Sequence, residues 1–158
     1  EDKRTFRDEN GFFQDISTWK GVGRVHGDVV SINWWYDDAI FEDLAWPGVV
    51  QVQPGGSIDL QWIPSTVHSF DIGSLELHGS IDTIALPRGL NVFRASQNQF
   101  QGTLFLPDLP PEIKVFSVRK NRLAGSIVLD SLSPTLMELD LSENRFVHAL
   151  ARCSISSE

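Results

Sequence analysis

The chain has very little cysteine, and this scarcity limits the classes of protein to which it can belong. Its 158 residues include a single cysteine, Cys153, which excludes an internal disulfide framework. None of the asparagines lies in an Asn-x-Ser/Thr glycosylation sequon. Together these absences favour an intracellular location, and a secreted or cell-surface location is the alternative.

Long hydrophobic runs and an excess of basic residues are also missing. No run of 18 apolar residues occurs, so the sequence predicts no transmembrane helix. The formal net charge is −8, and phosphate binding requires a basic surface, so nucleic acid is not expected as the primary partner. With 41% hydrophobic residues, the chain is long enough to form one domain with its own core.

The sequence contains no motif typical of catalysis or metal binding. Its histidines lie at positions 26, 68, 78 and 148, without a ligand spacing such as His-x-x-x-His, and no second cysteine joins them in a zinc pattern. No Gly-x-Ser-x-Gly, Walker or dinucleotide-binding motif occurs. We therefore expect no enzyme, no cofactor and no metal. Turnover that depends on His148, Cys153 or Asp140 would contradict this expectation.

What the sequence does contain is a repeat of 23 residues. Cut at Gly56, Gly79, Gly102 and Gly125, residues 56–147 form four units that align without a gap. Such a period is typical of a solenoid, in which units too small to bury their own apolar face stack on one another. The recurring glycine indicates a backbone position with positive φ or close approach of neighbouring coils. A proline follows in each unit and predicts extended or turn-like backbone there.

The second half of each unit carries the apolar pattern L-x-x-L-x-L-x-x-N-x-L. In the third unit this pattern consists of Ile113, Phe116, Val118, Asn121 and Leu123. The alternation in its central L-x-L places one set of side chains inward and the other outward, as in a short strand. One such strand per unit predicts a parallel sheet along one wall of the stack.

This pattern resembles the leucine-rich repeat family, specifically its plant-receptor-like variety, shortened by one residue as in many protist members. The resemblance covers residues 56–147. It implies an α/β-type repeat solenoid, a short leucine-rich repeat arc with a parallel β-sheet on the concave face and a mostly irregular convex side. It also implies an asparagine ladder, in which buried amides bond to backbone groups. The matching residues are Asn98, Asn121 and Asn144, whereas the first unit has Leu75 at this position.

Residues 1–55 lie outside the period and contain four of the five tryptophans. An amphipathic stretch is followed by Trp19-Lys20-Gly21-Val22 and by strand-like residues 27–34, an order that resembles the amino-terminal cap of plant-type leucine-rich repeats. The resemblance implies a helical cap followed by a degenerate repeat. The tryptophans form either the core of this cap or an aromatic recognition patch. The acidic run at residues 37–43 is either a solvated loop or a docking loop for a basic partner.

Residues 148–158 form a short tail that is too weakly patterned to cap the stack well. The apolar cross-section of the last unit therefore needs another cover. Its residues are Leu129, Leu132, Leu139, Leu141 and Phe146. Three alternatives remain: the chain is a fragment of a longer protein, another molecule supplies the cap, or the tail folds over the end.

In the leucine-rich repeat family, partners most often bind the concave wall. The candidate partner-binding residues on its outward positions are Asp71, Val92, Arg94, Val115, Ser117, Arg119, Glu138 and Asp140. Basic residues in the middle of the stack precede acidic residues on the last unit, and such a face can set the register of a partner of mixed charge. The alternative is that Arg119 pairs with Asp140 or Glu138 across the sheet.

The main functional hypothesis is a non-catalytic protein–protein interaction or scaffold module, which includes a structural subunit of a larger complex. The alternative is a secreted or surface-displayed recognition domain. The expected partner is a protein, and a partner or further sequence is one of the expected covers for the carboxyl-terminal end of the stack.

Overall fold

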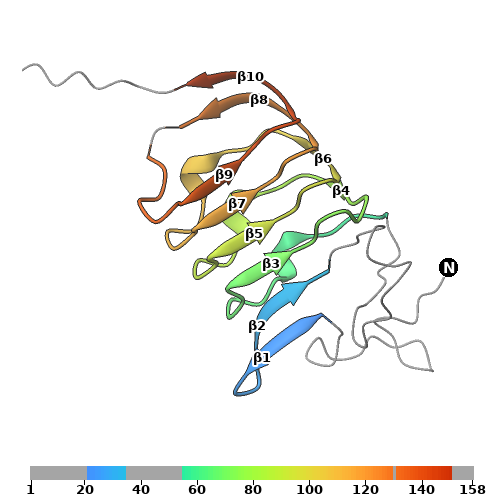
Figure 1. Ribbon diagram of the computed structural model, residues 1–158, viewed down its shortest axis with the longest axis vertical. Coiled ribbons are helices and arrows are strands. Elements are labelled where there is room, and N and C mark those ends of the chain that lie inside the picture. Colours follow the sequence, from blue (N-terminus) through green and yellow to red (C-terminus); the bar gives the residue numbers. More distant parts are fainter. Residues whose placement is uncertain (1–20, 35–54, 130, 151–158) are drawn as a thin grey trace, which may run out of the picture.

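The computed structural model describes residues 21–34, 55–129 and 131–150 (Figure 1). The acidic run at residues 37–43, the end of the tail and much of the amino-terminal cap and degenerate repeat expected within residues 1–55 lie outside these residues. The described part of that segment, residues 21–34, is not helical and so does not fit a helical cap. The described residues form ten β-strands and three short 3-10 helices, and they contain no α-helix. The described part of the chain is therefore mostly β.

The first two strands form a hairpin at the amino-terminal end of the stack. β1 (Val22–Val25) pairs antiparallel with β2 (Asp28–Asn33). The two residues between them, His26 and Gly27, have φ values of 51° and 96°, as tight hairpin turns require. The strand expected within residues 27–34 is therefore present, and it begins the main sheet.

One short strand from each repeat unit continues this sheet. These strands are β3 (Ser69–Asp71), β5 (Val92–Arg94), β7 (Val115–Ser117) and β9 (Glu138–Asp140). The strand order is β1-β2-β3-β5-β7-β9, and every pair after the hairpin is parallel (Figure 1). The predicted repeat solenoid with a parallel sheet is confirmed.

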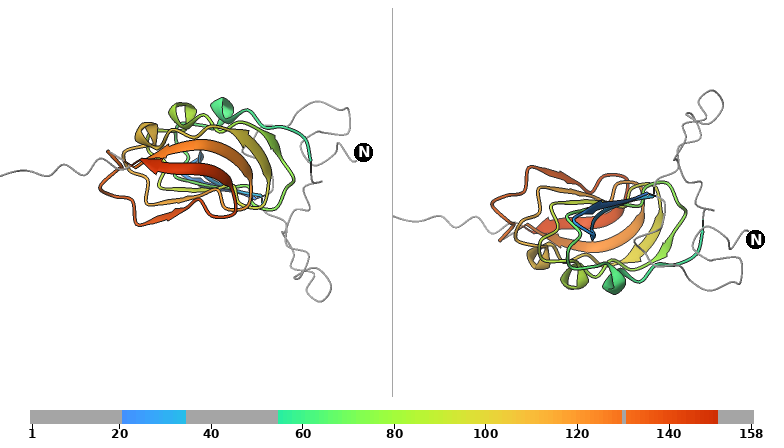
Figure 2. Two further views of the ribbon diagram at one scale, coloured as in Figure 1. Left: turned by 90° about the horizontal axis from the view of Figure 1, so that it is seen from above. Right: turned by 90° about the horizontal axis from the view of Figure 1, so that it is seen from below.

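A second sheet, which the repeat pattern did not predict, runs along the same stack. It consists of β4 (His78–Gly79), β6 (Gln99–Gly102), β8 (Arg122–Val128) and β10 (Arg145–Leu150), all parallel. The 3-10 helix η3 (Leu60–Trp62) precedes β4 along the chain, whereas η4 (Thr83–Ala85) follows β4 and η5 (Leu106–Asp108) follows β6. Viewed along the stack, the coils superimpose on one another (Figure 2).

The repeated glycines have the backbone conformation that their spacing predicts. Gly79, Gly102 and Gly125 have φ values of 128°, 93° and 89°. A Cβ at Gly125 would also lie 3.0 Å from Cγ2 of Thr103 in the preceding unit. This position therefore combines positive φ with close approach of neighbouring coils.

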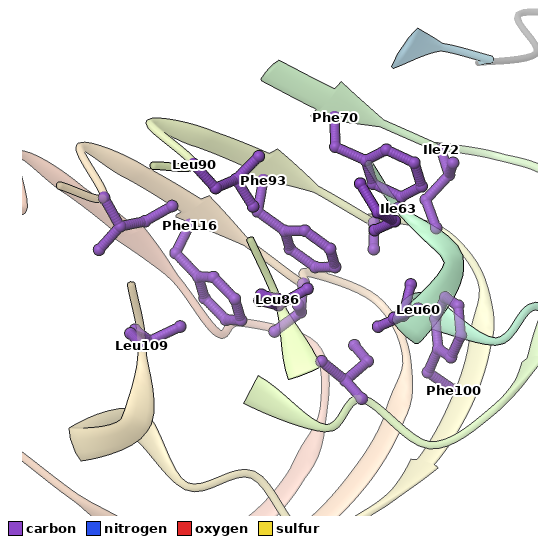
Figure 3. Packing of buried hydrophobic residues seen from close by; sticks show 14 of the residues in the cluster. Leu60, Ile63, Phe70, Ile72, Leu86, Leu90, Phe93, Phe100, Leu109 and Phe116 are labelled. Atoms are coloured by element: carbon purple, nitrogen blue, oxygen red, sulfur yellow. The ribbon is translucent and has the colours of Figure 1, made fainter. Parts of the chain in front are cut away.

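The core is a column of aromatic and aliphatic side chains that follows the central residue of each main-sheet strand. The rings of Phe70, Phe93 and Phe116 are fully buried and stack with centroids 5.9 Å and 5.2 Å apart (Figure 3). Trp62 packs edge-on against Phe70 and stacks on Trp34. Trp34, which is buried, therefore belongs to the core rather than to an exposed aromatic patch.

Candidate partner-binding face

The outward side chains of the main sheet form two rows that run across the strands. We call this surface the outer face. Register pairing places the first row at Ser31, Ser69, Val92, Val115 and Glu138, and the second row at Asn33, Asp71, Arg94, Ser117 and Asp140. The strands thus bring seven of the eight candidate residues into two adjacent rows, all except Arg119, with Val92 and Val115 in direct register.

The two valines give this face a small apolar centre. Val92 and Val115 are both half-buried on adjacent strands. Ser69 precedes them in the row and Glu138 follows them. The outer face therefore has a small, partly exposed apolar patch between polar neighbours.

Ser117 differs from the expectation, because it is buried rather than available to a partner. Only 7% of Ser117 is exposed, and its Oγ lies 2.8 Å from Oγ of Ser96. In the sheet it lies between Arg94 and Asp140, whose longer side chains flank it. Ser117 therefore offers little surface to a partner, since alternation identifies the side of a strand and not the degree of exposure.

Arg119 forms an ion pair with Glu143 rather than with the two acidic residues expected from the sequence. Nε and Nη2 of Arg119 donate to Oε1 of Glu143 at 2.9 Å and 2.5 Å. This hydrogen bond and the charge of Glu143 raise the pKa of Arg119, and Asp140 contributes a smaller Coulomb attraction. Both paired side chains are about half exposed, at 52% and 49%. The basic character of this part of the face is therefore partly neutralised.

The sequence pattern does not predict Glu143 as the partner of Arg119, because the backbone at Glu143 departs from the alternation of the strand. Counted from β9, residue 143 falls on the inward side. Its φ is instead 54°, in the left-handed region, as are those of its equivalents in the other units. These equivalents are Ser74, Gln97 and Lys120, with φ values of 57°, 57° and 54°. The 23-residue spacing of these polar positions was the available signal.

Asp71 and Asp140 occupy the same repeat position, but their pKa values shift in opposite directions. Oδ1 of Asp71 accepts the Gly73 amide at 3.0 Å, but burial raises the pKa of Asp71 and the nearby charge of Arg94 only partly offsets this. Oδ1 of Asp140 accepts both the hydroxyl and the amide of Ser142, at 2.6 Å and 3.0 Å, and these bonds lower the pKa of Asp140. Negative charge is therefore more strongly favoured at the β9 end of the face.

The asparagine side chains hold successive coils together beneath this face. Nδ2 of Asn121 donates to Val118 and Arg119 of its own coil and to Ala95 of the preceding one, while its Oδ1 accepts the Phe100 amide at 3.0 Å. Asn98 and Asn144 bond in the same way. The first unit has no asparagine at this position. Its Leu75 and Leu77 amides instead donate to Oδ1 of Asn98 from the second unit.

The outer face carries no cluster of metal-ligating side chains among the described residues. Across residues 21–34, 55–129 and 131–150 there is no group of three or more histidine, cysteine, aspartate or glutamate side chains placed to hold a metal. A hollow of about 330 Å³ lies beside η3 and η4 and is lined partly by Asp59 and Asp82. Both carboxylates already accept backbone amides of their own 3-10 helices.

Comparison of the chain with protein-family models, with curated proteins and with solved structures found no match. Among the described residues, no helix has the length and apolar character needed to cross a membrane.

Proposed function

We propose that this chain is a non-catalytic module that binds another protein through its outer face. The observation that carries the proposal is the pair Val92 and Val115, half-buried and in register, in a face that also holds Arg94, Glu138 and Asp140. A preformed sheet loses little conformational entropy when it binds, because its side chains already lie on a rigid support. A scaffold or a structural subunit of a larger complex would use the same surface.

We further propose that the units are leucine-rich repeats. The apolar pattern repeats every 23 residues, each unit contributes one strand to a parallel sheet, and a buried asparagine in successive units bonds to the backbone of two coils. These features support the family through its sequence pattern and its hydrogen-bonding scheme. The expected use of the sheet for protein recognition follows from that resemblance.

The charges on this face favour a partner of mixed charge. Arg94 lies in the middle strand β5, whereas Glu138 and Asp140 lie on the last strand β9. A partner with acidic groups over β5 and basic groups over β9 would bind in one register, and the reversed orientation would bring like charges together. The apolar centre would supply binding energy, and the charges would supply orientation.

Affinity capture from an extract of the source cells tests the proposal. The double variant Arg94→Glu/Arg119→Glu changes the charge of the outer face. The matched control Arg122→Glu/Arg145→Glu makes the same charge change on β8 and β10 of the second sheet, where both arginines are exposed. We expect the first variant to lose at least about tenfold of a captured protein relative to the control, equivalent to roughly 1.4 kcal/mol.

A direct contact is tested by placing a photo-crosslinking amino acid at Val115 and, as a control, at Ile84, which is 65% exposed in η4. The same captured protein should crosslink from position 115 and not from position 84. Equal capture by both charge variants, together with crosslinking from neither position or from position 84 alone, would contradict binding at the outer face.

A further inference from the structure

The core becomes more exposed at the last unit of the stack. In the third unit the inward residues Ile113, Phe116, Val118 and Leu123 each have 0% exposure. Their equivalents in the fourth unit, 23 residues later, are Leu136, Leu139, Leu141 and Phe146, and all four are only partly buried. We call these four residues and the free edge of β9 the end face. It adjoins the outer face, with which it shares strand β9.

Among the described residues, two backbone amides at this edge have no acceptor equivalent to the one that serves the corresponding amides of earlier units. The amides of Ile72, Ala95 and Val118 each donate to a carbonyl of the following coil at 2.9 Å. Those of Ser74, Gln97 and Lys120 do the same at 2.9 Å. For the equivalent amides of Leu141 and Glu143, the described residues supply no acceptor. A further parallel strand would supply both acceptors.

The asparagine ladder ends at the same place. The Val118 carbonyl accepts Nδ2 of its own Asn121 at 3.0 Å and Nδ2 of Asn144 from the following coil at 2.9 Å. The equivalent Leu141 carbonyl accepts Asn144 at 3.0 Å, and no second donor comes from the described residues. The end face thus presents donors, an acceptor and apolar side chains in the geometry that each earlier coil offers to the next.

The outward residues of β9 indicate the charge of a complementary strand. Glu138 and Asp140 are the outward pair of this strand. Cross-strand neighbours of opposite charge stabilise a sheet, whereas like charges destabilise it. A second copy of this chain, added antiparallel through β9, would place these carboxylates next to their own counterparts. Charge therefore disfavours a symmetric dimer at this edge and favours basic neighbours.

From these observations we propose that the end face binds a β-strand of another protein, which adds parallel to β9 with apolar side chains inward and lysine or arginine outward. The inward side chains would cover Leu139 and Leu141, and the basic ones would lie beside Glu138 and Asp140. The carbonyls of the added strand would accept the amides of Leu141 and Glu143. This inference does not depend on binding at the outer face.

A pair of synthetic peptides tests the proposal. Both copy residues 112–124 with blocked ends, since this segment contains β7, which adds parallel to the edge of β5 that corresponds to the outer edge of β9. One carries Val115→Lys and Ser117→Lys, and the other carries glutamate at the same two positions. We expect the lysine peptide to bind at least about tenfold more tightly in fluorescence anisotropy, because two charge pairs distinguish the peptides. At saturation it should slow hydrogen exchange of the Leu141 and Glu143 amides, measured by NMR, at least about tenfold.

Variants of the protein reverse or preserve this preference. Glu138→Lys should reduce the preference for the lysine peptide, and Glu138→Lys/Asp140→Lys should reverse it. Asp28→Lys makes the same charge change as Glu138→Lys on β2 and should leave the preference unchanged. The single Glu138 variant keeps the Asp140–Ser142 hydrogen bonds, and amide NMR spectra verify the fold of each variant.

Several results would overturn the proposal. Equal binding of the two peptides, or binding without protection of Leu141 and Glu143, would exclude strand addition guided by charge. Protection in the free monomer that disappears on removal of residues 151–158 would show that the chain's own tail covers the end face. Protection that increases with protein concentration, together with a doubled mass in light scattering, would show that a second copy covers it.

Discussion

Arg119 and Glu143, which lie 24 residues apart on successive coils, form an ion pair at the edge of the outer face. It links the third unit to the fourth. Both partners are about half exposed, and solvent screens ion pairs of this kind so that they contribute little to stability. The pair therefore positions a charge more than it stabilises the fold.

The first prediction concerns this pair. We expect Arg119→Ala to shift the midpoint of urea unfolding only slightly, because solvent screens the exposed pair, and the exchanged variant Arg119→Glu/Glu143→Arg to recover most of that shift. The coupling energy from the double-mutant cycle should fall between low and high salt because the pair is accessible to ions. A large coupling that salt does not change would show that the pair is effectively buried.

The second prediction concerns the asparagine ladder. Asn121→Ala should destabilise the protein by about 1–3 kcal/mol, because the Phe100 amide loses its acceptor and carbonyls of two coils lose a donor. Asn144→Ala is the matched variant one unit later, where the side chain is only partly buried, and it should cost less. Urea unfolding measures both. Equal costs would mean that the last coil is as well covered as the third.

The third prediction compares core positions along the stack. Phe93→Ala removes a fully buried ring that stacks on both neighbouring phenylalanines, and it should cost about 3–5 kcal/mol. Leu139 follows Phe116 in this column and is only partly buried. Leu139→Ala should therefore fall below the usual range of about 2–5 kcal/mol for a buried leucine. A cost of Leu139→Ala within the upper half of that range would contradict an open end face.

The fourth prediction concerns pH. Burial raises the pKa of Asp71, so the folded state binds its proton more tightly and this group opposes folding at neutral pH. Asp71→Asn should be more stable than the parent at pH 7, and the difference should vanish when the pH falls below the ordinary aspartate pKa. Hydrogen bonds from Ser142 lower the pKa of Asp140, whose stabilisation is present above the ordinary pKa and is lost as pH falls through the folded value.

Asp140→Asn should accordingly be destabilising at pH 7 and neutral at low pH, the opposite sign from Asp71→Asn. Urea unfolding at several pH values measures both effects. NMR titration of the side-chain carboxyl carbons should show Asp140 ionising at a lower pH than Asp71. The reverse order would mean that burial does not dominate at Asp71.

Much of the fold was predictable because the repeat constrains it locally. Gly102 and Gly125 share a repeat position, and both have the positive φ that this spacing predicts. Phe93 and Phe116 occupy inward positions of the alternating pattern, and both are fully buried. Period and alternation depend only on backbone geometry and on the need to bury apolar surface, so a single sequence is sufficient to predict them.

The candidate site was less predictable, because its details depend on contacts between units. Ser117 lies on the predicted outward side of its strand, but it is buried between Arg94 and Asp140. Glu143, rather than a residue of β9, pairs with Arg119, because a left-handed residue turns the chain after the strand. Alternation contains no information about the length of a neighbouring side chain or about a change in backbone direction.

The sequence by itself determined the period, the inward column of the main sheet and the positions of the ladder asparagines, since each follows from local pattern and burial. Only the tertiary structure decided the second sheet, the partner of Arg119 and the difference in burial between Phe116 and Leu139. The second sheet is held by backbone hydrogen bonds, which require no particular side-chain pattern, so the apolar repeat does not predict it. The difference in burial depends on whether another coil follows in space, because side-chain burial is a property of neighbours.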